Sequence, residues 1–385
     1  MYDNATCACV LLIKVTTHKN YNRAQKHLER LQQVATSTTF VLLHTCIESS
    51  YTMRDIPIVD FGAFLHGDEP ARKKVARDID TAFRDVGFVY LTNHGVPKDK
   101  IEQCFAWSQK FFALPLATKM LAPHPPGGAH HRGYSAPGLE KVSQHEYDAS
   151  ELSKLRNVPD YKESFECGNA SDAAQPNIWL PEHTLPGFRP FMQDYFSICA
   201  GLIHSILDAL SIALEVPDPG LSATHSASLF QLRLLHYPAL DAQQLARNQR
   251  ARINAHSDFG TLTLLFQDRV GGLEIEAPRH PGTFRAAEPV DGAVLVNVGD
   301  LLARWSNDRW RSTVHRVGLP AGYQRDADGG GLVPDRYSVP VFATADMDAV
   351  IEALPGCWSD ADPKKYEAVT AWGYVQMRMA ALYAS

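Results

Sequence analysis

The chain has 385 residues, with 37 basic and 43 acidic side chains, a net charge of −6 and 45% hydrophobic residues. This length can bury a large core, and the slightly acidic charge does not favour a nucleic-acid or membrane partner. No apolar run reaches the roughly 18 residues that a membrane span needs. The seven cysteines are scattered, without a paired zinc spacing, which favours a reducing compartment. We therefore predict a cytoplasmic monomer whose partner is a small molecule.

The first stretch, residues 1–52, differs in character from everything after it. It carries a basic and polar run at residues 18–23, but neither a continuous apolar signal region nor an Arg-rich, acid-poor helix is clear. We predict that these residues are an extension, poorly ordered or not part of the fold. The folded chain is then expected to begin at Met53.

Residues 53–190 show a regular alternation of apolar runs with Gly and Pro breaks. The expected elements are strands over residues 56–61, 87–96 and 160–166, a helix over residues 69–86, and a second helix that precedes Leu114. Residues 123–138 are rich in Pro, Gly and His and are expected to form a loop. We interpret this part as an N-terminal region that carries a substrate-contacting loop.

Within that loop, Arg132 and Tyr134 place a cation and an aromatic ring on either side of a glycine. Loops on a rigid scaffold are common sites of substrate contact, so both are candidate substrate residues. A solvated loop without a ligand explains the same residues equally well.

The remainder of the chain divides into a long helix, a run of short strands and a last helix. Residues 191–214 show the longest helical pattern, within a helix-and-link segment over residues 191–227. The core, residues 228–345, contains short predicted strands at 229–237, 253–256, 261–267, 273–276, 293–298, 312–317 and 337–342. Such a series favours an antiparallel barrel or a double-sheet jelly roll.

The C-terminal segment, residues 346–385, ends in an amphipathic helix predicted over residues 366–383. The expected fold is therefore mostly β with flanking helices: a double-stranded β-helix (jelly-roll) core, an α/β N-terminal region and a C-terminal helix.

The strongest chemical signal lies in the predicted strands of that core. His256 and Asp258 are two residues apart, so an extended chain places both side chains on one face. His315 lies 57 residues beyond Asp258 in another β-branched run. Two imidazoles and one carboxylate form the facial triad of non-haem Fe(II) sites, which leaves coordination positions open. We predict that these three residues bind a metal ion.

Two other histidines compete for this interpretation. His66 and Asp68 repeat the His-x-Asp spacing, but they lie in a polar turn with no strand around them, and we interpret the repeat as accidental. His94 follows a predicted strand in an Asn-His-Gly turn, where a hydrogen-bonded structural role is favoured over metal binding.

A second group of polar residues is expected beside the metal. Arg336 and Ser338 share one strand face, and a guanidinium with a neighbouring hydroxyl suits a carboxylate, which an arginine binds through two parallel hydrogen bonds. Tyr237 could add a phenol from a neighbouring strand. We also predict that Phe266 and Phe342 contact the substrate.

These motifs together resemble the iron(II)/2-oxoglutarate-dependent dioxygenase superfamily, in the branch similar to isopenicillin N synthase. The resemblance runs from Ile56 to the final helix, and its N-terminal part rests on Ile56-Pro57-Ile58-Val59-Asp60, Gly87-Phe88 and Asn93-His94-Gly95-Val96.

The resemblance implies roles for the residues already named. His256, Asp258 and His315 would bind Fe(II), while Arg336, Ser338 and Tyr237 would hold the distal carboxylate of 2-oxoglutarate. The expected activity couples decarboxylation of 2-oxoglutarate by O2 to hydroxylation, desaturation or ring formation at a C–H bond of a small metabolite, in secondary or amino-acid metabolism. One departure is His236, where many relatives have Asn before the Tyr-Pro pair.

Two alternatives stay open on the sequence. An Fe(II) oxidase of the same fold, similar to isopenicillin N synthase, would need no 2-oxoglutarate, because the same Arg and Ser can hold the carboxylate of the substrate. A jelly-roll binding protein without turnover would not need a complete open triad. Iron-dependent consumption of oxygen separates this last possibility from the two enzymes.

Overall fold

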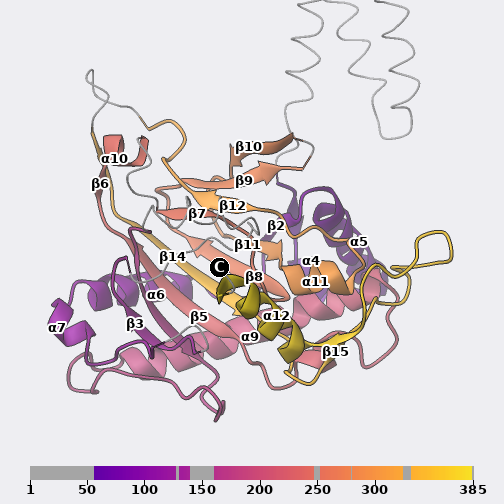
Figure 1. Cartoon of the computed structure of the whole chain (residues 1–385), viewed down its shortest axis with the longest axis horizontal. Helices are drawn as coiled ribbons and strands as arrows, with labels where there is room; N and C mark the ends of the chain where they lie inside the picture. The colour runs from indigo at the N-terminus through magenta and orange to yellow at the C-terminus, as the bar shows by residue number, and fades with distance from the viewer. Residues whose placement is uncertain are drawn as a thin grey trace, which may run out of the picture. The chain divides into compact units, whose positions relative to one another are not determined.

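A computed structural model describes residues 56–126, 130–138, 160–246, 252–278, 280–323 and 331–383. The predicted extension, residues 1–52, lies outside the described residues. The described part is mostly β-sheet, with helices along one side of the larger sheet (Figure 1).

The strands follow the chain in this order: β1 (Ile58–Asp60), β2 (Phe88–Thr92), β3 (Gly133–Ser135), β4 (Glu163–Gly168), β5 (Gln231–Tyr237), β6 (Leu240–Asp241), β7 (Ile253–His256), β8 (Leu262–Gln267), β9 (Leu273–Ala277), β10 (His280–Ala286), β11 (Ala293–Val298), β12 (His315–Val317), β13 (Leu332–Val333), β14 (Arg336–Ala343), β15 (Val350–Ile351) and β16 (Val369–Thr370). The helices are α4 (Gly62–His66), α5 (Glu69–Asp85), α6 (Lys98–Phe112), α7 (Leu116–Lys119), α9 (Phe188–Ala213), the 3-10 turn η1 (Ser222–His225), α10 (Ala242–Ala246), α11 (Asp300–Trp305) and α12 (Ala371–Tyr383).

Two sheets form the core. The larger has the strand order β1-β2-β11-β8-β14-β5-β4-β3, and the smaller has the order β10-β9-β12-β7. Their facing surfaces share one hydrophobic cluster, in which Leu235 and Leu295 of the larger sheet meet Ile253, Ile275 and Val317 of the smaller one. The strands of both sheets are antiparallel except for the β1–β2 pair, and this packing of two sheets confirms the predicted jelly roll.

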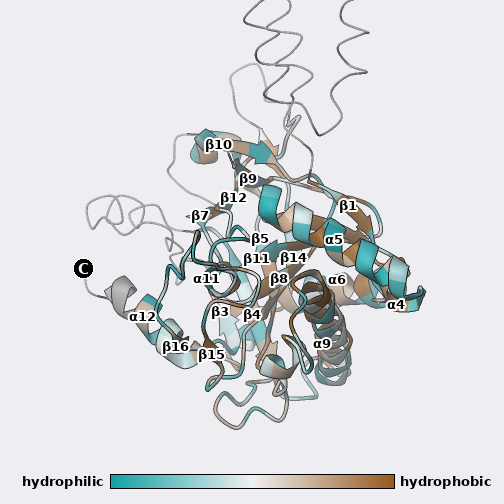
Figure 2. Cartoon of the chain, turned by 90° about the vertical axis from the view of Figure 1, so that its right-hand side faces the viewer, coloured by the Kyte–Doolittle hydropathy of each residue, from teal (hydrophilic) through white to brown (hydrophobic). Residues whose placement is uncertain are grey.

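Helices cover the other face of the larger sheet. Side chains of α5, α6 and α9, such as Phe83, Phe111 and Ile206, share a core with outward residues of the strands, such as Leu232 and Val339. Figure 2 shows α5 and α9 on one side of β8, β11 and β14, with β7, β9 and β12 on the other. Each strand of the larger sheet therefore has a helix face and a barrel face.

The longest helix, α9, is long and apolar enough by length and composition to cross a membrane, the one such helix among the described residues. Its apolar side is buried in the core of the described fold. A buried helix of this kind passes the same compositional test as a membrane span.

Most expected elements are present with shifted ends. The strands at 253–256 and 293–298 have the predicted bounds, and the long helix runs from Phe188 to Ala213. No pattern in the sequence indicated β10, the short strand β3 inside the expected loop, or α11. β10 is exposed along most of its length, so no buried face marks it in the sequence.

Candidate metal centre and carboxylate site

Strand register brings together the three predicted metal ligands. His256 is the last residue of β7 and His315 the first of β12, and these antiparallel strands place the two histidines directly opposite each other. Asp258 follows two residues after His256. The three side chains form a group whose potential ligand atoms lie within 4.8 Å of one another.

The two imidazoles are oriented by backbone carbonyls. The Nδ1 of His256 lies 2.9 Å from the carbonyl oxygen of Asn254, and the Nδ1 of His315 lies 3.1 Å from that of Thr313. Because a carbonyl oxygen only accepts, each Nδ1 carries the proton and each Nε2 offers a lone pair. These Nε2 atoms lie 3.8 and 3.7 Å from Oδ1 of Asp258.

The other oxygen of Asp258 is held by neutral donors. Its Oδ2 accepts hydrogen bonds from the Thr263 hydroxyl at 2.6 Å and the Asn297 amide at 2.8 Å. Outer contacts of this type orient metal ligands in proteins. Oδ1 is left facing the two imidazoles, so three donor atoms converge on one point.

Burial and neighbouring groups hold His256 and Asp258 in the protonation states that bind a cation. Burial and the neighbouring His315 hold the pKa of His256 well below its ordinary value, so the ring is neutral at pH 7. Burial raises the pKa of Asp258, but His315, His256 and the hydrogen bonds from Asn297 and Thr263 outweigh it and lower that pKa overall. A neutral imidazole and an ionised carboxylate are the forms that bind metal.

The predicted carboxylate site is buried on the barrel face of β5 and β14. Arg336 pairs in register with Tyr237, its guanidinium lies 4.9 Å from the centre of that phenol ring, and both are almost fully buried. Arg336 donates to Ser338 Oγ at 3.2 Å and to Gln267 Oε1 at 3.1 Å. The structure thus brings together the three residues expected to hold a carboxylate.

A second arginine, which the sequence analysis missed, joins this site. Arg252 is fully buried beside the ring of Tyr237 and donates to the carbonyl of Pro334. Burial, then repulsion from Arg336, lowers its pKa to about 10. Within the described part of the chain, Nε of Arg336 and Nε and Nη1 of Arg252 have no hydrogen-bond partner. Buried donors of this kind suit an anion.

Other functional residues were also missed, although some left a signal in the sequence. Asn297 is the one polar residue in the buried run of β11, and Thr263 lies on the barrel face of β8. A lone polar residue in a buried strand indicates a specific partner. That the partner is Asp258 depends on the pairing of β11 with β8.

Three of the four predicted substrate residues have other neighbours. Arg132 donates to the carbonyls of Gln175 and His131, and the Tyr134 hydroxyl donates to Glu163 at 2.6 Å. Phe266 lies on the helix face of β8, packed between His94 and Tyr195. These contacts favour packing roles, and substrate contact by these residues stays a prediction.

Phe342 is different, because it shares the barrel face of β14 with Arg336 and Ser338. The guanidinium of Arg233 lies 5.7 Å from the centre of its ring. Its place in the barrel is compatible with the predicted substrate contact, which stays a prediction.

Neither competing histidine belongs to a group of metal-ligand residues in the described part of the chain. Asp68 accepts from the amide of Ala71 at 3.0 Å and caps α5, and His66 is exposed, so this copy of the His-x-Asp spacing forms no cluster among the described residues. His94 is buried and accepts from the amide of Val96 at 3.2 Å, which confirms its predicted hydrogen-bonded role.

The His236 departure also lies outside the site. The two ring nitrogens of His236 form hydrogen bonds with the carboxylates of Glu163 at 2.7 Å and Asp335 at 2.8 Å, and the ring stacks on Tyr337. Because side chains alternate along β5, His236 points away from the barrel face that carries Tyr237.

Known proteins resemble this chain in sequence and in fold. Residues 229–345 match the 2OG-Fe(II) oxygenase superfamily, and residues 56–182 match the N-terminal region of a non-haem dioxygenase in morphine synthesis. The 2-oxoglutarate-dependent dioxygenase frbA of Dothideomycetidae sp. (strain 11243) is 39% identical over 85% of this chain and 97% of its own length. The chain belongs to the 2OG-Fe(II) oxygenase superfamily.

Two further relatives of this oxygenase are informative. The proline hydroxylase buaE of Petromyces alliaceus is 39% identical over 86% of the chain and 100% of its own length. A full-length protein of Neurospora crassa, whose crystal structure holds alpha-KG and thymine, is 38% identical, with a TM-score of 0.73, over 85% of this chain and 97% of that one. As a member of the superfamily, the oxygenase uses Fe(II), 2-oxoglutarate and O2, and it is an oxidoreductase.

Proposed function

We propose that His256, Asp258 and His315 hold the Fe(II) of this oxygenase. The observation that carries the proposal is the convergence of two Nε2 lone pairs and one carboxylate oxygen, each fixed from behind by a backbone carbonyl or a neutral donor. Three protein donors leave other coordination positions for small ligands. When bound, Fe(II) supplies the activation of O2 for which 2-oxoglutarate provides two electrons, with succinate and CO2 as products.

The buried arginine site is proposed to hold the distal carboxylate of 2-oxoglutarate. Arg336, Ser338 and Tyr237 supply the guanidinium and hydroxyl groups, and Arg252 adds a second positive charge. The protein's own contribution is to fix the co-substrate, keep water away from it and hold one C–H bond of the substrate near the metal.

The proposed reaction is hydroxylation of a C–H bond in a small, nitrogen-containing metabolite, within secondary or amino-acid metabolism. Two relatives support this class, because one is named a proline hydroxylase and another was crystallised with thymine.

We propose the same division of the chain as the sequence indicates: an N-terminal region over residues 53–190, a helix and link over residues 191–227, a catalytic core over residues 228–345 and a C-terminal segment over residues 346–385.

The oxygenase is further proposed to act as a cytoplasmic monomer without a nucleic-acid or membrane partner. The net charge of −6 and the free, buried thiols of the four described cysteines support this. Size-exclusion chromatography with light scattering should give a mass near that of one chain, and a stable dimer would contradict the proposal.

The decisive experiment measures oxygen uptake and succinate together. Iron-loaded protein is incubated with a panel of free amino acids and pyrimidines, with and without 2-oxoglutarate. Succinate that forms in step with the oxidised substrate supports the proposal. Full substrate turnover without 2-oxoglutarate would instead make the protein an Fe(II) oxidase.

A further inference from the structure

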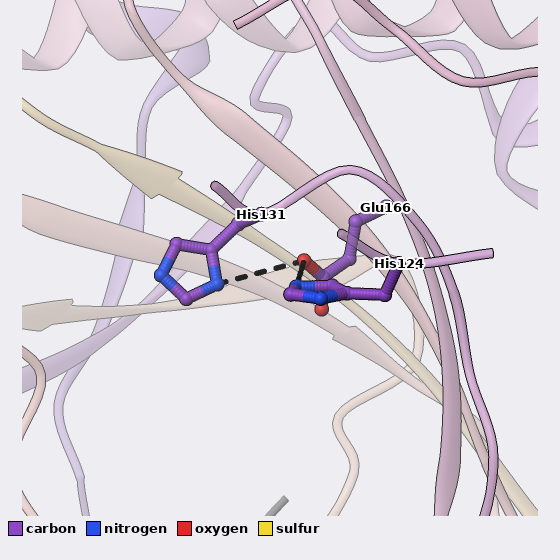
Figure 3. A group of neighbouring side chains, drawn as sticks. All are labelled: His124, His131 and Glu166. Atoms are coloured by element: carbon purple, nitrogen blue, oxygen red, sulfur yellow. Dashed lines mark ion pairs between the residues drawn. The ribbon is translucent and has the colours of Figure 1, made fainter. Parts of the chain in front are cut away.

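A second group of two histidines and a carboxylate lies apart from the iron triad. Glu166 of β4 is fully buried, and its Oε2 lies 3.9 Å from Nε2 of His124 and 3.7 Å from Nδ1 of His131. Figure 3 shows both imidazoles beside the same carboxylate oxygen. The other oxygen, Oε1, lies 2.7 Å from the guanidinium of Arg233. We call these four residues the Glu166 cluster.

The Arg233–Glu166 pair lies on the barrel face of the larger sheet. Phe165 and Cys167, on either side of Glu166, are buried in the helix-face core, and so are Leu232 and Leu234 on either side of Arg233. Since side chains alternate along a strand, Glu166 and Arg233 point the opposite way, toward the smaller sheet that carries the two triad histidines.

Strand register places this pair at the depth of the active site. Glu166 lies directly opposite Arg233, and Arg233 lies midway along β5 between the positions opposite Ser338 and Phe342. Phe342 is in turn opposite Thr263, whose hydroxyl holds Asp258. Successive rows on one face are about 7 Å apart. The pair therefore lines the barrel between the level of the proposed 2-oxoglutarate site and that of the iron site.

The chemistry of the cluster calls for a cation between the imidazole and the carboxylate. Nδ1 of His124 lies 2.7 Å from the carbonyl oxygen of Pro125 and donates to it, which leaves Nε2 as the ring nitrogen that can accept a hydrogen bond. That acceptor faces a second acceptor, Oε2 of Glu166, across 3.9 Å, too far for a hydrogen bond. An ammonium group with two N–H donors could bridge them.

A divalent metal ion is the competing occupant, and Arg233 argues against it. Its guanidinium lies against the same carboxylate at 2.7 Å and adds a fixed positive charge beside any metal. A monovalent ammonium suffers less repulsion. If the ligand is a zwitterion, the carboxylate of the same molecule can bind the guanidinium of Arg233. No charge is then left unpaired in the barrel.

We propose that the Glu166 cluster recognises the substrate as a small zwitterionic amino or imino acid. Arg233 binds its carboxylate, and Glu166 with His124 binds its ammonium group, while His131 flanks the carboxylate of Glu166. The inference rests on the proposed function, because it names the substrate class of the same barrel.

The chain offers a matched control pair. Arg316 of β12 and Glu274 of β9 are also directly opposite each other, with Nε and Oε2 2.7 Å apart. Their side chains are 43% and 26% exposed, whereas those of Arg233 and Glu166 are 13% and 0% exposed. Charge removal at Arg316 therefore tests for nonspecific effects of breaking an Arg–Glu pair across two strands.

The test is calorimetry on the full chain loaded with one equivalent of Mn(II), which prevents turnover, and with 2-oxoglutarate. The free protein amino acids are titrated first, and the tightest is compared with its methyl ester and its N-acetyl derivative. We expect the free amino acid to bind at least about thirtyfold more tightly than either derivative, because each lacks one charge-assisted contact. Arg233→Gln should abolish the preference over the ester and Glu166→Gln the preference over the N-acetyl form, while Arg316→Gln should keep both.

Each other outcome overturns the inference. If no amino acid binds, or if neither variant changes the preferences, the cluster does not recognise a zwitterion. Tight binding of thymine that depends on Arg233 would make the ligand a neutral heterocycle. A second Zn(II) per chain that is lost in Glu166→Gln would make the cluster a metal site.

Two further measurements keep the result interpretable. Should a single variant fail to fold, the double variant Arg233→Gln with Glu166→Gln removes both charges together, and it should bind the amino acid and its derivatives equally. A failure of 2-oxoglutarate itself to bind the Mn(II)-loaded chain would contradict the proposed function instead.

Discussion

Two places in this barrel each bring two imidazoles and one carboxylate together at nearly the same spacing. In the triad, two imidazole nitrogens lie 3.8 and 3.7 Å from a carboxylate oxygen of Asp258, and in the Glu166 cluster the corresponding distances are 3.9 and 3.7 Å. Both carboxylates are buried. Spacing and residue type alone would therefore assign a metal ion to each.

The two sites differ in the groups that contact the second oxygen of the carboxylate. The second oxygen of Asp258 accepts from the neutral groups of Thr263 and Asn297, so its full negative charge is available to a metal. The second oxygen of Glu166 faces the guanidinium of Arg233, which already neutralises it. The triad histidines also lie on paired strands, whereas His124 and His131 both precede the short strand β3 and lie in no named strand. The charge of the outer partner distinguishes the two sites.

The largest expected effect separates the clusters by iron binding. His256→Ala, Asp258→Ala or His315→Ala should abolish turnover and stoichiometric Fe(II) binding, because each removes one of three protein ligands. His124→Ala and His66→Ala should keep one iron per chain, measured by metal analysis after gel filtration. Iron loss in His124→Ala with retention in His315→Ala would reverse the assignment.

A buried histidine outside both clusters should make the free energy of unfolding depend on pH. His225 bonds Leu221 and Thr261, and burial lowers its pKa to about 4. The unfolded chain takes up this proton near its ordinary pKa of about 6.5, so the free energy of unfolding should fall by about 3 kcal/mol as the pH drops from 6.5 to 4. Urea titrations of metal-free wild type and His225→Gln should differ in this slope, and equal slopes would contradict the prediction.

Loss of a neutral hydrogen-bond partner of Asp258 should weaken Fe(II) binding without abolishing it. Asn297→Leu or Thr263→Val removes one hydrogen bond to Oδ2 and should weaken Fe(II) binding by about 10- to 100-fold. Competition with a chelator measures the affinity, and Thr261→Val, in the same strand region but bonded to His225, serves as the control. Unchanged affinity in both Asp258-partner variants would show that the outer contacts do not tune this site.

Removal of the Arg336 guanidinium should weaken the binding of 2-oxoglutarate alone. Arg336→Ala is expected to raise the half-saturating 2-oxoglutarate concentration by at least about tenfold, because a buried charge-assisted contact contributes on the order of 2 kcal/mol or more. Arg316→Ala should leave that concentration unchanged. An unaltered value in Arg336→Ala would locate the 2-oxoglutarate site elsewhere.

The smallest effect is expected at the amino terminus. A chain that begins at Met53 should keep the melting temperature and the turnover of the full chain, since the match to the N-terminal region of a non-haem dioxygenase begins at residue 56. Differential scanning calorimetry and succinate formation provide the check. A marked loss of either would show that residues 1–52 contribute to the catalytic fold.

The sequence by itself determined the local parts of this oxygenase. Alternation along a strand placed His256 with Asp258 and Arg336 with Ser338, and the series of short strands predicted the jelly roll. These patterns are readable because a period of two depends only on neighbours in the chain. The long helix was found for the same reason.

Only the tertiary structure decided which distant residues meet. His315 lies opposite His256 because β12 pairs with β7, and Arg233 lies opposite Glu166 because β5 pairs with β4. Register depends on how whole sheets bury their faces, so no local pattern specifies it. The charge beside each carboxylate follows from that register, which is why the sequence predicted the triad but indicated neither the Glu166 cluster nor its charged partner.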